Sequence, residues 1–112
     1  MADKVGYFSN QRAEIVPFVP ADIKFALDVG CGEGNFGALL KKKFQCSVWG
    51  IEPDRTAAIA AKERLDYVIN EPFTDELNLN SQKFDVIFFN DVLEHLTDPI
   101  MALTVADRYL NI

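Results

Sequence analysis

The sequence predicts an α/β fold of three layers, in which helices cover both faces of a parallel β-sheet. Short β-strand patterns alternate with helix patterns along most of the chain, as in parallel sheets with right-handed crossovers. Residues 84–89 are apolar on both faces, which is typical of a strand inside a parallel sheet. The first predicted strand runs directly into a glycine-rich turn, and ligands of such sheets bind at the carboxyl ends of the strands.

The first half of the chain contains two predicted helices and two predicted strands. A short helix is expected over residues 9–19, ending before Pro20, and a strand over Phe25–Val29. Residues 35–44 predict the next helix, because their large apolar side chains recur at helical spacing. These side chains belong to Phe36, Leu39, Leu40 and Phe44. Ser47–Ile51 is the second predicted strand.

The middle of the chain continues the alternation. Pro53 and Asp54 predict the start of a helix over residues 55–65, whose small side chains suit close packing on a sheet. Tyr67–Ile69 and residues 84–89 are the third and fourth predicted strands.

The last predicted helix begins with a recognisable start signal. Asp98 is expected to be its N-cap, with Pro99 as its first residue. We expect the apolar face of this helix to be formed by Ile100, Leu103, Ala106 and Leu110.

The composition indicates a single cytoplasmic domain. The chain has 112 residues, of which 49% are hydrophobic and 25% charged, and its net charge of −6 disfavours nucleic acid and anionic membranes as partners. No apolar signal region begins the sequence, and the longest apolar run, residues 86–89, is too short to span a bilayer. Two cysteines, Cys31 and Cys46, fit a reducing compartment better than a disulfide scaffold. We expect a leader over residues 1–24 and a core over residues 25–112.

A glycine-rich turn and an acidic residue mark the predicted ligand site. Gly30, Gly32 and Gly34 alternate after the first strand, so the backbone can turn sharply and no Cβ blocks a ligand lying against it. Glu52 ends the second strand, 24 residues after Asp28. In nucleotide-binding βαβ units, an acid in this place accepts hydrogen bonds from ribose hydroxyls. The pattern favours a nucleoside site, and a tight connection without a ligand is the alternative.

Two cofactor classes compete for this site. The glycines at positions 32, 34 and 37 match the dinucleotide pattern, which supports NAD, but that pattern begins three residues after Val29 instead of directly after the strand. Asp28 and Glu33 flank the turn and no Lys or Arg lies between Asp28 and Leu40, so a pyrophosphate would meet carboxylates without a cation. S-adenosylmethionine, with its ammonium and sulfonium groups, suits these acids better. An NAD-dependent oxidoreductase stays the less favoured alternative.

Three segments resemble the motifs of one enzyme family. Residues 26–34 closely resemble the first motif of class I S-adenosylmethionine-dependent methyltransferases, and residues 50–54 resemble their second. Residues 84–96, followed by Asp98 and Pro99, are similar to the fourth-strand motif of the branch that contains ubiquinone-type O-methyltransferases. The resemblance implies a Rossmann-like sheet with strand order 3-2-1-4, truncated relative to the seven strands of the family. It also implies S-adenosylmethionine as cofactor and methyl transfer to an O, N or C acceptor.

The resemblance implies roles for individual residues. The three glycines of the turn would lie under the methionine and ribose portions, Glu52 would bind the ribose hydroxyls, and Ile51 or Pro53 would flank the adenine. Asp28 would orient the turn or hold the cofactor's amino group through water. Glu71 would accept from the adenine amino group, and Asn90 would offer its backbone near the methionine end. The implied cofactor-binding set is Asp28, Gly30, Cys31, Gly32, Gly34, Glu52, Pro53, Glu71 and Asn90.

Methyl transfer mainly requires alignment of the acceptor, the methyl group and the sulfur. His95, the one histidine, is the candidate general base for an acceptor with a poorly acidic proton, and a capping or packing role is its alternative. The resemblance implies that Tyr7, Phe8 and Arg12 of the leader close over the ligand, with plain surface positions as the alternative. Cys31 is interpreted as a packing residue and not a nucleophile. The cysteines and the histidine do not have the spacing of a metal site.

The length of the chain raises a second functional hypothesis. Members of the resembled family usually continue with a fifth strand and an antiparallel hairpin, whereas this chain ends at Ile112. The apolar fourth strand would then be an open edge, so either the chain is a fragment whose core is incomplete at the C-terminus, or a partner chain or a second copy covers that edge. The second hypothesis is therefore a non-catalytic S-adenosylmethionine-binding module or fragment. We expect a small-molecule acceptor, and neither nucleic acid nor a membrane as partner.

Overall fold

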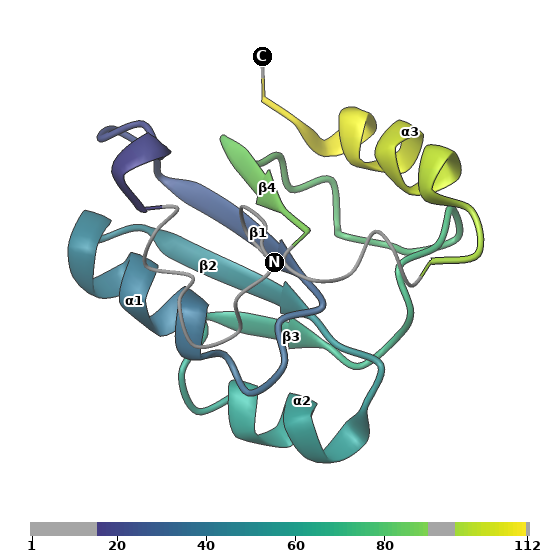
Figure 1. Cartoon of the computed structure of the whole chain (residues 1–112), viewed down its shortest axis with the longest axis horizontal. Coiled ribbons are helices and arrows are strands. Elements are labelled where there is room, and N and C mark those ends of the chain that lie inside the picture. Colours follow the sequence, from purple (N-terminus) through teal and green to yellow (C-terminus); the bar gives the residue numbers. More distant parts are fainter. Residues whose placement is uncertain (1–15, 90–95, 112) are drawn as a thin grey trace, which may run out of the picture.

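The structure is a computed structural model, and it describes residues 16–89 and 96–111 (Figure 1). Its strands are β1 (Phe25–Val29), β2 (Ser47–Ile51), β3 (Tyr67–Ile69) and β4 (Val86–Phe88), and its helices are α1 (Asn35–Phe44), α2 (Arg55–Ala61) and α3 (Pro99–Tyr109). Residues 16–18 form a 3₁₀ turn. A helix is predicted over residues 9–19, and of these the structure describes only residues 16–19.

The four strands form one parallel sheet in the order β3-β2-β1-β4. This confirms the predicted fold class and strand order. β1 and β2 pair along their whole length, from Phe25 opposite Ser47 to Val29 opposite Ile51. Since all pairs are parallel, the carboxyl ends of β1, β2 and β3 lie at one edge of the sheet (Figure 1).

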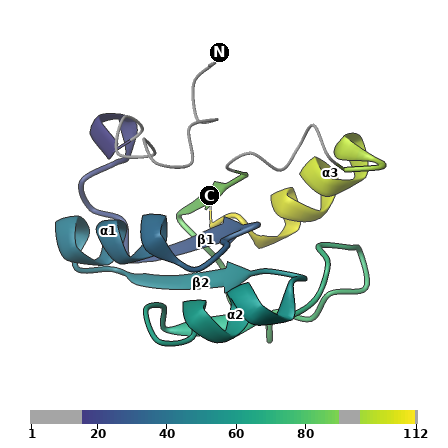
Figure 2. The same cartoon turned by 60° about the horizontal axis from the view of Figure 1, so that its bottom comes forward.

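The sheet separates two hydrophobic clusters. Successive side chains of a strand point to opposite faces, so Ala26 and Val48 pack against α1 and α2, whereas Leu27 and Ile51 pack with the buried side chains of α3. Helices α1 and α2 therefore cover one face of the sheet and α3 covers the other (Figures 1 and 2). This is the predicted three-layer arrangement.

Helix α2 is shorter than predicted. The expected helix over residues 55–65 ends at Ala61, after which the chain forms a tighter turn. In that turn the N–H of Arg64 donates to the carbonyl of Ala61, three residues back, at 2.9 Å. The tightening places Leu65 in the core, where its side chain is 6% exposed.

The apolar face predicted for α3 is right for Ala106, which is buried, and wrong for Ile100 and Leu103. Ile100 and Leu103 are 75% and 50% exposed, and Leu110 is the extended residue that ends the helix. The buried residues of α3 are Ala102, Val105 and Ala106. They are small, and bulky side chains of the loop between β3 and β4, such as Phe73 and Leu79, fill the same cluster. The predicted cap is confirmed, since the Asp98 side chain accepts from the N–H of Met101.

On the β4 side of the sheet, Phe84 lies two residues before the strand and pairs with the end of the chain. The fourth strand, predicted over residues 84–89, is restricted to β4, and Phe84 instead forms a parallel bridge with Leu110. The N–H of Phe84 donates to the carbonyl of Tyr109 at 2.7 Å, and the N–H of Asn111 donates to that of Phe84 at 2.8 Å. Among the described strands, β4 itself pairs with β1 alone. The expectation of an open edge therefore applies to β4 and not to Phe84.

Candidate functional site

Three short segments meet where β1, β2 and β3 end. Residues 30–34 follow β1, residues 52–54 follow β2, and residues 70–71 follow β3. The first segment is also bonded to the end of β2, because the N–H groups of Gly30 and Cys31 donate to the carbonyl of Ile51 at 2.7 and 3.1 Å. The parallel register thus brings most of the predicted site residues to one edge.

The three glycines of the turn have left-handed backbone conformations, with φ of 75° at Gly30, 57° at Gly32 and 89° at Gly34. Side-chain-bearing residues rarely adopt such angles, which explains glycine here. The glycines differ in their surroundings. A Cβ on Gly32 would meet nothing within 4 Å, whereas a Cβ on Gly34 would lie 3.2 Å from the Cα of Ala61. Gly32 therefore borders open space, and Gly34 lets α2 approach closely.

Glu52 links the turn after β1 to the start of α2. Its Oε1 accepts from the N–H of Gly32 at 2.8 Å, and its Oε2 accepts from the N–H of Asp54 at 3.0 Å. Asp54 in turn caps α2 by accepting from the N–H of Ala57. The carboxylate is thus held beside the open side of Gly32, and its predicted ribose-binding role stays a prediction.

Cys31 is packed beneath the turn. Its thiol donates to the carbonyl of Gly32 at 3.5 Å, and its Sγ would lie 2.6 Å from a Cβ on Gly50 of β2. Burial, followed by the negative charges of Asp28 and Glu52, raises the pKa of Cys31 from 9.0 to about 12. The thiol is therefore protonated at neutral pH, which agrees with a packing role and not with that of a nucleophile.

Asp28 is the buried acid of the site, with 2% of its surface exposed. It stands in β1, opposite Gly50 of β2 and Phe88 of β4. A carboxylate in this place puts negative charge under the glycine turn, which favours a positively charged ligand over a phosphate.

Asn70 is a residue of the site that the sequence analysis did not identify. Its Nδ2 donates to two backbone carbonyls, that of Glu52 at 2.8 Å and that of Pro53 at 2.9 Å. The only sequence signal was the position of an amide side chain directly after a strand. Pro53 and Glu71, both predicted to contact the adenine, are exposed at the same edge.

Arg64 brings a cation to the glycine turn from the turn that follows α2. Its guanidinium donates to the carbonyls of Glu33 at 3.0 Å and Ala60 at 3.2 Å. Arg64 lies 31 residues from Glu33 in the sequence, so a count of charges within the glycine turn alone misses it. The guanidinium is engaged by two carbonyl oxygens.

Five predicted residues lie outside the described part of the chain. They are Tyr7, Phe8, Arg12, Asn90 and His95. The roles of a closing leader, a backbone contact near the methionine end and a general base therefore stay predictions.

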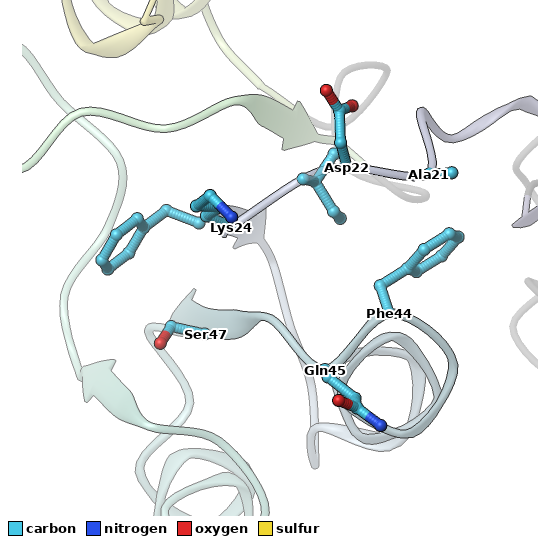
Figure 3. Close-up of a pocket in the computed structure, with 8 residues that line it drawn as sticks. Ala21, Asp22, Lys24, Phe44, Gln45 and Ser47 are labelled. Carbon is cyan, nitrogen blue, oxygen red and sulfur yellow. The ribbon is translucent and has the colours of Figure 1, made fainter.

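A separate hollow of about 440 Å³ lies at the opposite edge of the sheet. It is lined by the beginnings of β1 and β2 and the end of α1, and Figure 3 shows Lys24, Phe44, Gln45 and Ser47 around it. None of the predicted site residues lines this hollow. The candidate site is therefore the carboxyl edge of the sheet.

Comparison with known sequences finds relatives that are methyltransferases. The ubiquinone biosynthesis O-methyltransferase of Histophilus somni is 36% identical over 90 residues, which cover 71% of this chain and 37% of the relative. The tRNA U34 carboxymethyltransferase of Helicobacter hepaticus is 31% identical over 110 residues, covering 87% of this chain and 35% of the relative. The chain thus spans little more than a third of the length of these curated relatives.

Solved structures share the fold. The plantazolicin methyltransferase BpumL in complex with SAH superposes with a TM-score of 0.73 at 19% identity, covering 91% of this chain and 46% of that one. The magnesium protoporphyrin IX methyltransferase ChlM from Synechocystis PCC 6803 with bound SAM gives a TM-score of 0.70 at 16% identity, covering 91% and 52%. A family model described as a methyltransferase domain matches residues 11–111. With this match, the resemblance noted in the motifs is confirmed: the chain belongs to the methyltransferase domain family, of the class I S-adenosylmethionine-dependent type.

Proposed function

We propose that this chain forms the S-adenosylmethionine-binding part of a methyltransferase that methylates an O, N or C atom of its acceptor. The observation that carries the proposal is the Glu52 carboxylate, held beside the open side of Gly32 at the ends of β1 and β2. Support also comes from solved relatives of the same fold that contain SAH or SAM.

The residues of the edge fit this cofactor chemically. Ribose hydroxyls donate hydrogen bonds, and ionised Glu52 is purely an acceptor. The sulfonium and the ammonium are positive, and Asp28 and Glu52 give the turn the opposite charge. Arg64, in the turn that follows α2, points its guanidinium at the carbonyls of Glu33 and Ala60. A diphosphate at the turn would meet the two carboxylates of Asp28 and Glu52, which repel it.

The chain's own contribution to methyl transfer is positioning. The cofactor, when bound, supplies an activated methyl group on a sulfonium that leaves as a neutral thioether, so the leaving group needs no proton. The glycine turn lets the backbone approach the ligand, Glu52 holds the ribose, and Pro53 and Glu71 border the adenine. Such alignment lowers the activation barrier by several kcal/mol, about 7 or more where it is complete. His95 is proposed as the base where the acceptor requires one.

Binding of three ligands tests the proposal directly. Calorimetric titration of the chain should give micromolar dissociation constants for S-adenosylmethionine and SAH and no measurable heat with NAD. Tighter binding of NAD than of SAH would instead support an oxidoreductase and overturn the proposal.

Turnover separates the two remaining hypotheses. We expect transfer of a labelled methyl group from S-adenosylmethionine to a small-molecule acceptor, screened among quinols, acids and sugars. Because one relative carries tRNA in its name, transfer RNA is the competing acceptor in the same screen. Tight cofactor binding without transfer to any acceptor would favour the non-catalytic binding module.

Location and assembly are also proposals. In the part of the chain that the structure describes, no helix is long and apolar enough to cross a membrane. We propose a cytoplasmic protein whose β4 edge is paired by a second copy or a partner chain. Sedimentation of the purified chain at micromolar concentration should reveal a dimer, and a monomer would contradict pairing by a second copy.

A further inference from the structure

The side chain of Asn70 closes the gap where β2 and β3 stop pairing. The last backbone hydrogen bond between these strands runs from the N–H of Glu52 to the carbonyl of Ile69, at 2.9 Å. Beyond it, the carbonyls of Glu52 and Pro53 accept from the single Nδ2 of Asn70, at 2.8 and 2.9 Å. The side-chain amide thus supplies the donors that the ended strand no longer provides.

The peptide that carries Glu52 is consequently held on both sides. Its N–H is bonded to Ile69 and its carbonyl to Asn70, while the carboxylate reaches forward to Gly32 and Asp54. The hydrogen bonds of the Asn70 side chain go to the backbone carbonyls of Glu52 and Pro53 and not to the Glu52 carboxylate. It acts on the backbone from which the Glu52 side chain extends.

We propose that Asn70 is a positioning residue that sets the place and direction of the Glu52 carboxylate for ribose binding. This inference rests on the proposed function. A binding group must be held to within about 0.5 Å of its productive place, and supporting hydrogen bonds provide that precision. Asn70 holds the backbone of Glu52, and the Glu52 carboxylate bonds the turn after β1 and the start of α2. Through Glu52, Asn70 therefore links the ends of β1, β2 and β3.

Asparagine suits this task through its donors. One amide nitrogen carries two N–H groups, and each is directed at a separate carbonyl oxygen. Aspartate has nearly the same shape, but when ionised it only accepts hydrogen bonds. In Asn70→Asp, a negative oxygen would therefore face two carbonyl oxygens and push the Glu52–Pro53 segment away.

Affinity for SAH and exchange of two backbone amides test the proposal. Asn70→Asp should weaken SAH binding about tenfold, the order expected when two neutral hydrogen bonds are lost. In the unliganded protein, the Gly32 and Asp54 amides, both bonded to the Glu52 carboxylate, should exchange faster with solvent by NMR. Asn70→Ala removes the same hydrogen bonds without adding repulsion, so its loss of SAH affinity and its increase in amide exchange should be smaller. This variant replaces Asn70→Asp in the test if Asn70→Asp does not fold.

Asn78→Ala is the matched control. Asn78 is also an exposed loop asparagine, and its side chain accepts from the N–H of Asn80 at 2.8 Å. Loss of that bond should leave SAH affinity and both amide exchange rates unchanged. If Asn78→Ala weakens SAH binding as much as Asn70→Asp, the effect is general destabilisation and the proposal is overturned.

A double-mutant cycle with Glu52→Gln separates positioning from a direct contact. Because Asn70 acts through Glu52, Asn70→Asp should cost much less than tenfold in the Glu52→Gln background. An equal loss in both backgrounds, or unchanged affinity and exchange in Asn70→Asp, overturns the proposal. If the unsubstituted chain does not bind SAH, the proposed function fails, and exchange at Gly32 and Asp54 still decides whether Asn70 positions Glu52.

Discussion

The two edges of the sheet use the same hydrogen-bonding device for different purposes. At the amino edge, Asp85 accepts from the N–H groups of Lys24 and Phe25 at 2.7 and 3.0 Å, and Asp66 accepts from that of Val48 at 2.7 Å. At the carboxyl edge, Glu52 accepts from backbone N–H groups of Gly32 and Asp54. In each case a carboxylate satisfies donors that strand pairing leaves free.

The difference lies in what surrounds the carboxylate. Asp85 and Asp66 hold the beginnings of β1 and β2, where the chain only enters the sheet. Glu52 stands beside Gly32, whose missing side chain leaves open space. Carboxylate–amide bonding is therefore not itself a sign of a binding site, and open backbone beside it is the distinguishing feature.

Cysteine reactivity should give the largest effect. Cys31 lies at the carboxyl edge and has a pKa raised to about 12, so its thiolate fraction at pH 8 is about a thousandfold below that of a thiol at 9.0. In a Cys46→Ser variant, a thiol-specific reagent should react with the folded chain about a thousandfold more slowly than with the urea-unfolded chain. A comparable rate in both states would contradict the buried, charge-repelled environment.

Cys46, at the amino edge, is the natural counterpart. Burial raises the pKa of this thiol too, and here no site carboxylate contributes. In a Cys31→Ser variant, the thiol of Cys46 should therefore also react more slowly in the folded chain than in the unfolded chain. Addition of SAH should change the reactivity of Cys31 and not that of Cys46.

Removal of the Glu52 carboxylate should affect ligand binding more than stability. Glu52→Ala should weaken SAH binding by about 100-fold, because hydrogen bonds to a charged group contribute about 1.5–3 kcal/mol each. Titration calorimetry measures this loss. Asp66→Ala, at the other edge, is the matched control and should leave affinity unchanged; equal losses would remove the distinction between the edges.

Removal of Asp85 should have the opposite profile. Asp85→Ala should lower the free energy of unfolding by about 2 kcal/mol, because two strand-start amides lose their acceptor, and should leave SAH affinity unchanged. Urea unfolding of Asp85→Ala and of Glu52→Ala measures the free energy of unfolding of each variant. Stability equal to that of the original chain would show that water replaces this carboxylate without cost.

Asp85 also predicts a pH dependence. The hydrogen bonds from the N–H groups of Lys24 and then Phe25 lower the pKa of Asp85 below 3.8. A carboxyl with a lower pKa in the folded chain adds stability that is present above about pH 4 and is lost as the pH falls through the folded value. Stability between pH 4 and 2 should therefore fall less steeply in Asp85→Asn than in the original chain. Parallel curves would contradict this assignment.

The smallest effect is expected for the ion pair between Lys41 and Asp66, whose side chains lie 2.9 Å apart and are 33% and 37% exposed. Exposed pairs contribute about 0.5 kcal/mol, so Lys41→Ala should shift the urea midpoint only slightly. Asp66→Ala should cost more, because it also removes the acceptor of the Val48 N–H. A larger loss of stability in Lys41→Ala than in Asp66→Ala would contradict this prediction, because the ion pair would then contribute more than the hydrogen bond from Val48.

The sequence predicted the elements whose signals are local. The bounds of β1, α1, β2 and β3 agree with the structure, since each has its own apolar period and ends at glycine, proline or polar residues. It predicted Ala106 of α3 correctly and failed on Ile100 and Leu103, which compete with the smaller stripe of Ala102 and Val105. A periodic pattern cannot choose between two apolar stripes, because the choice depends on which side chains the rest of the fold places against the helix.

The sequence by itself determined the alternation of strands and helices, the left-handed glycine turn and the acid at the end of β2, because backbone conformational limits and apolar periodicity act over a few residues. Only the tertiary structure placed Asn70 on the carbonyls of Glu52 and Pro53, and Arg64 on that of Glu33. These bonds join segments 17 to 31 residues apart. Their partners are set by the register of the parallel strands and the tightened end of α2, which no local pattern encodes.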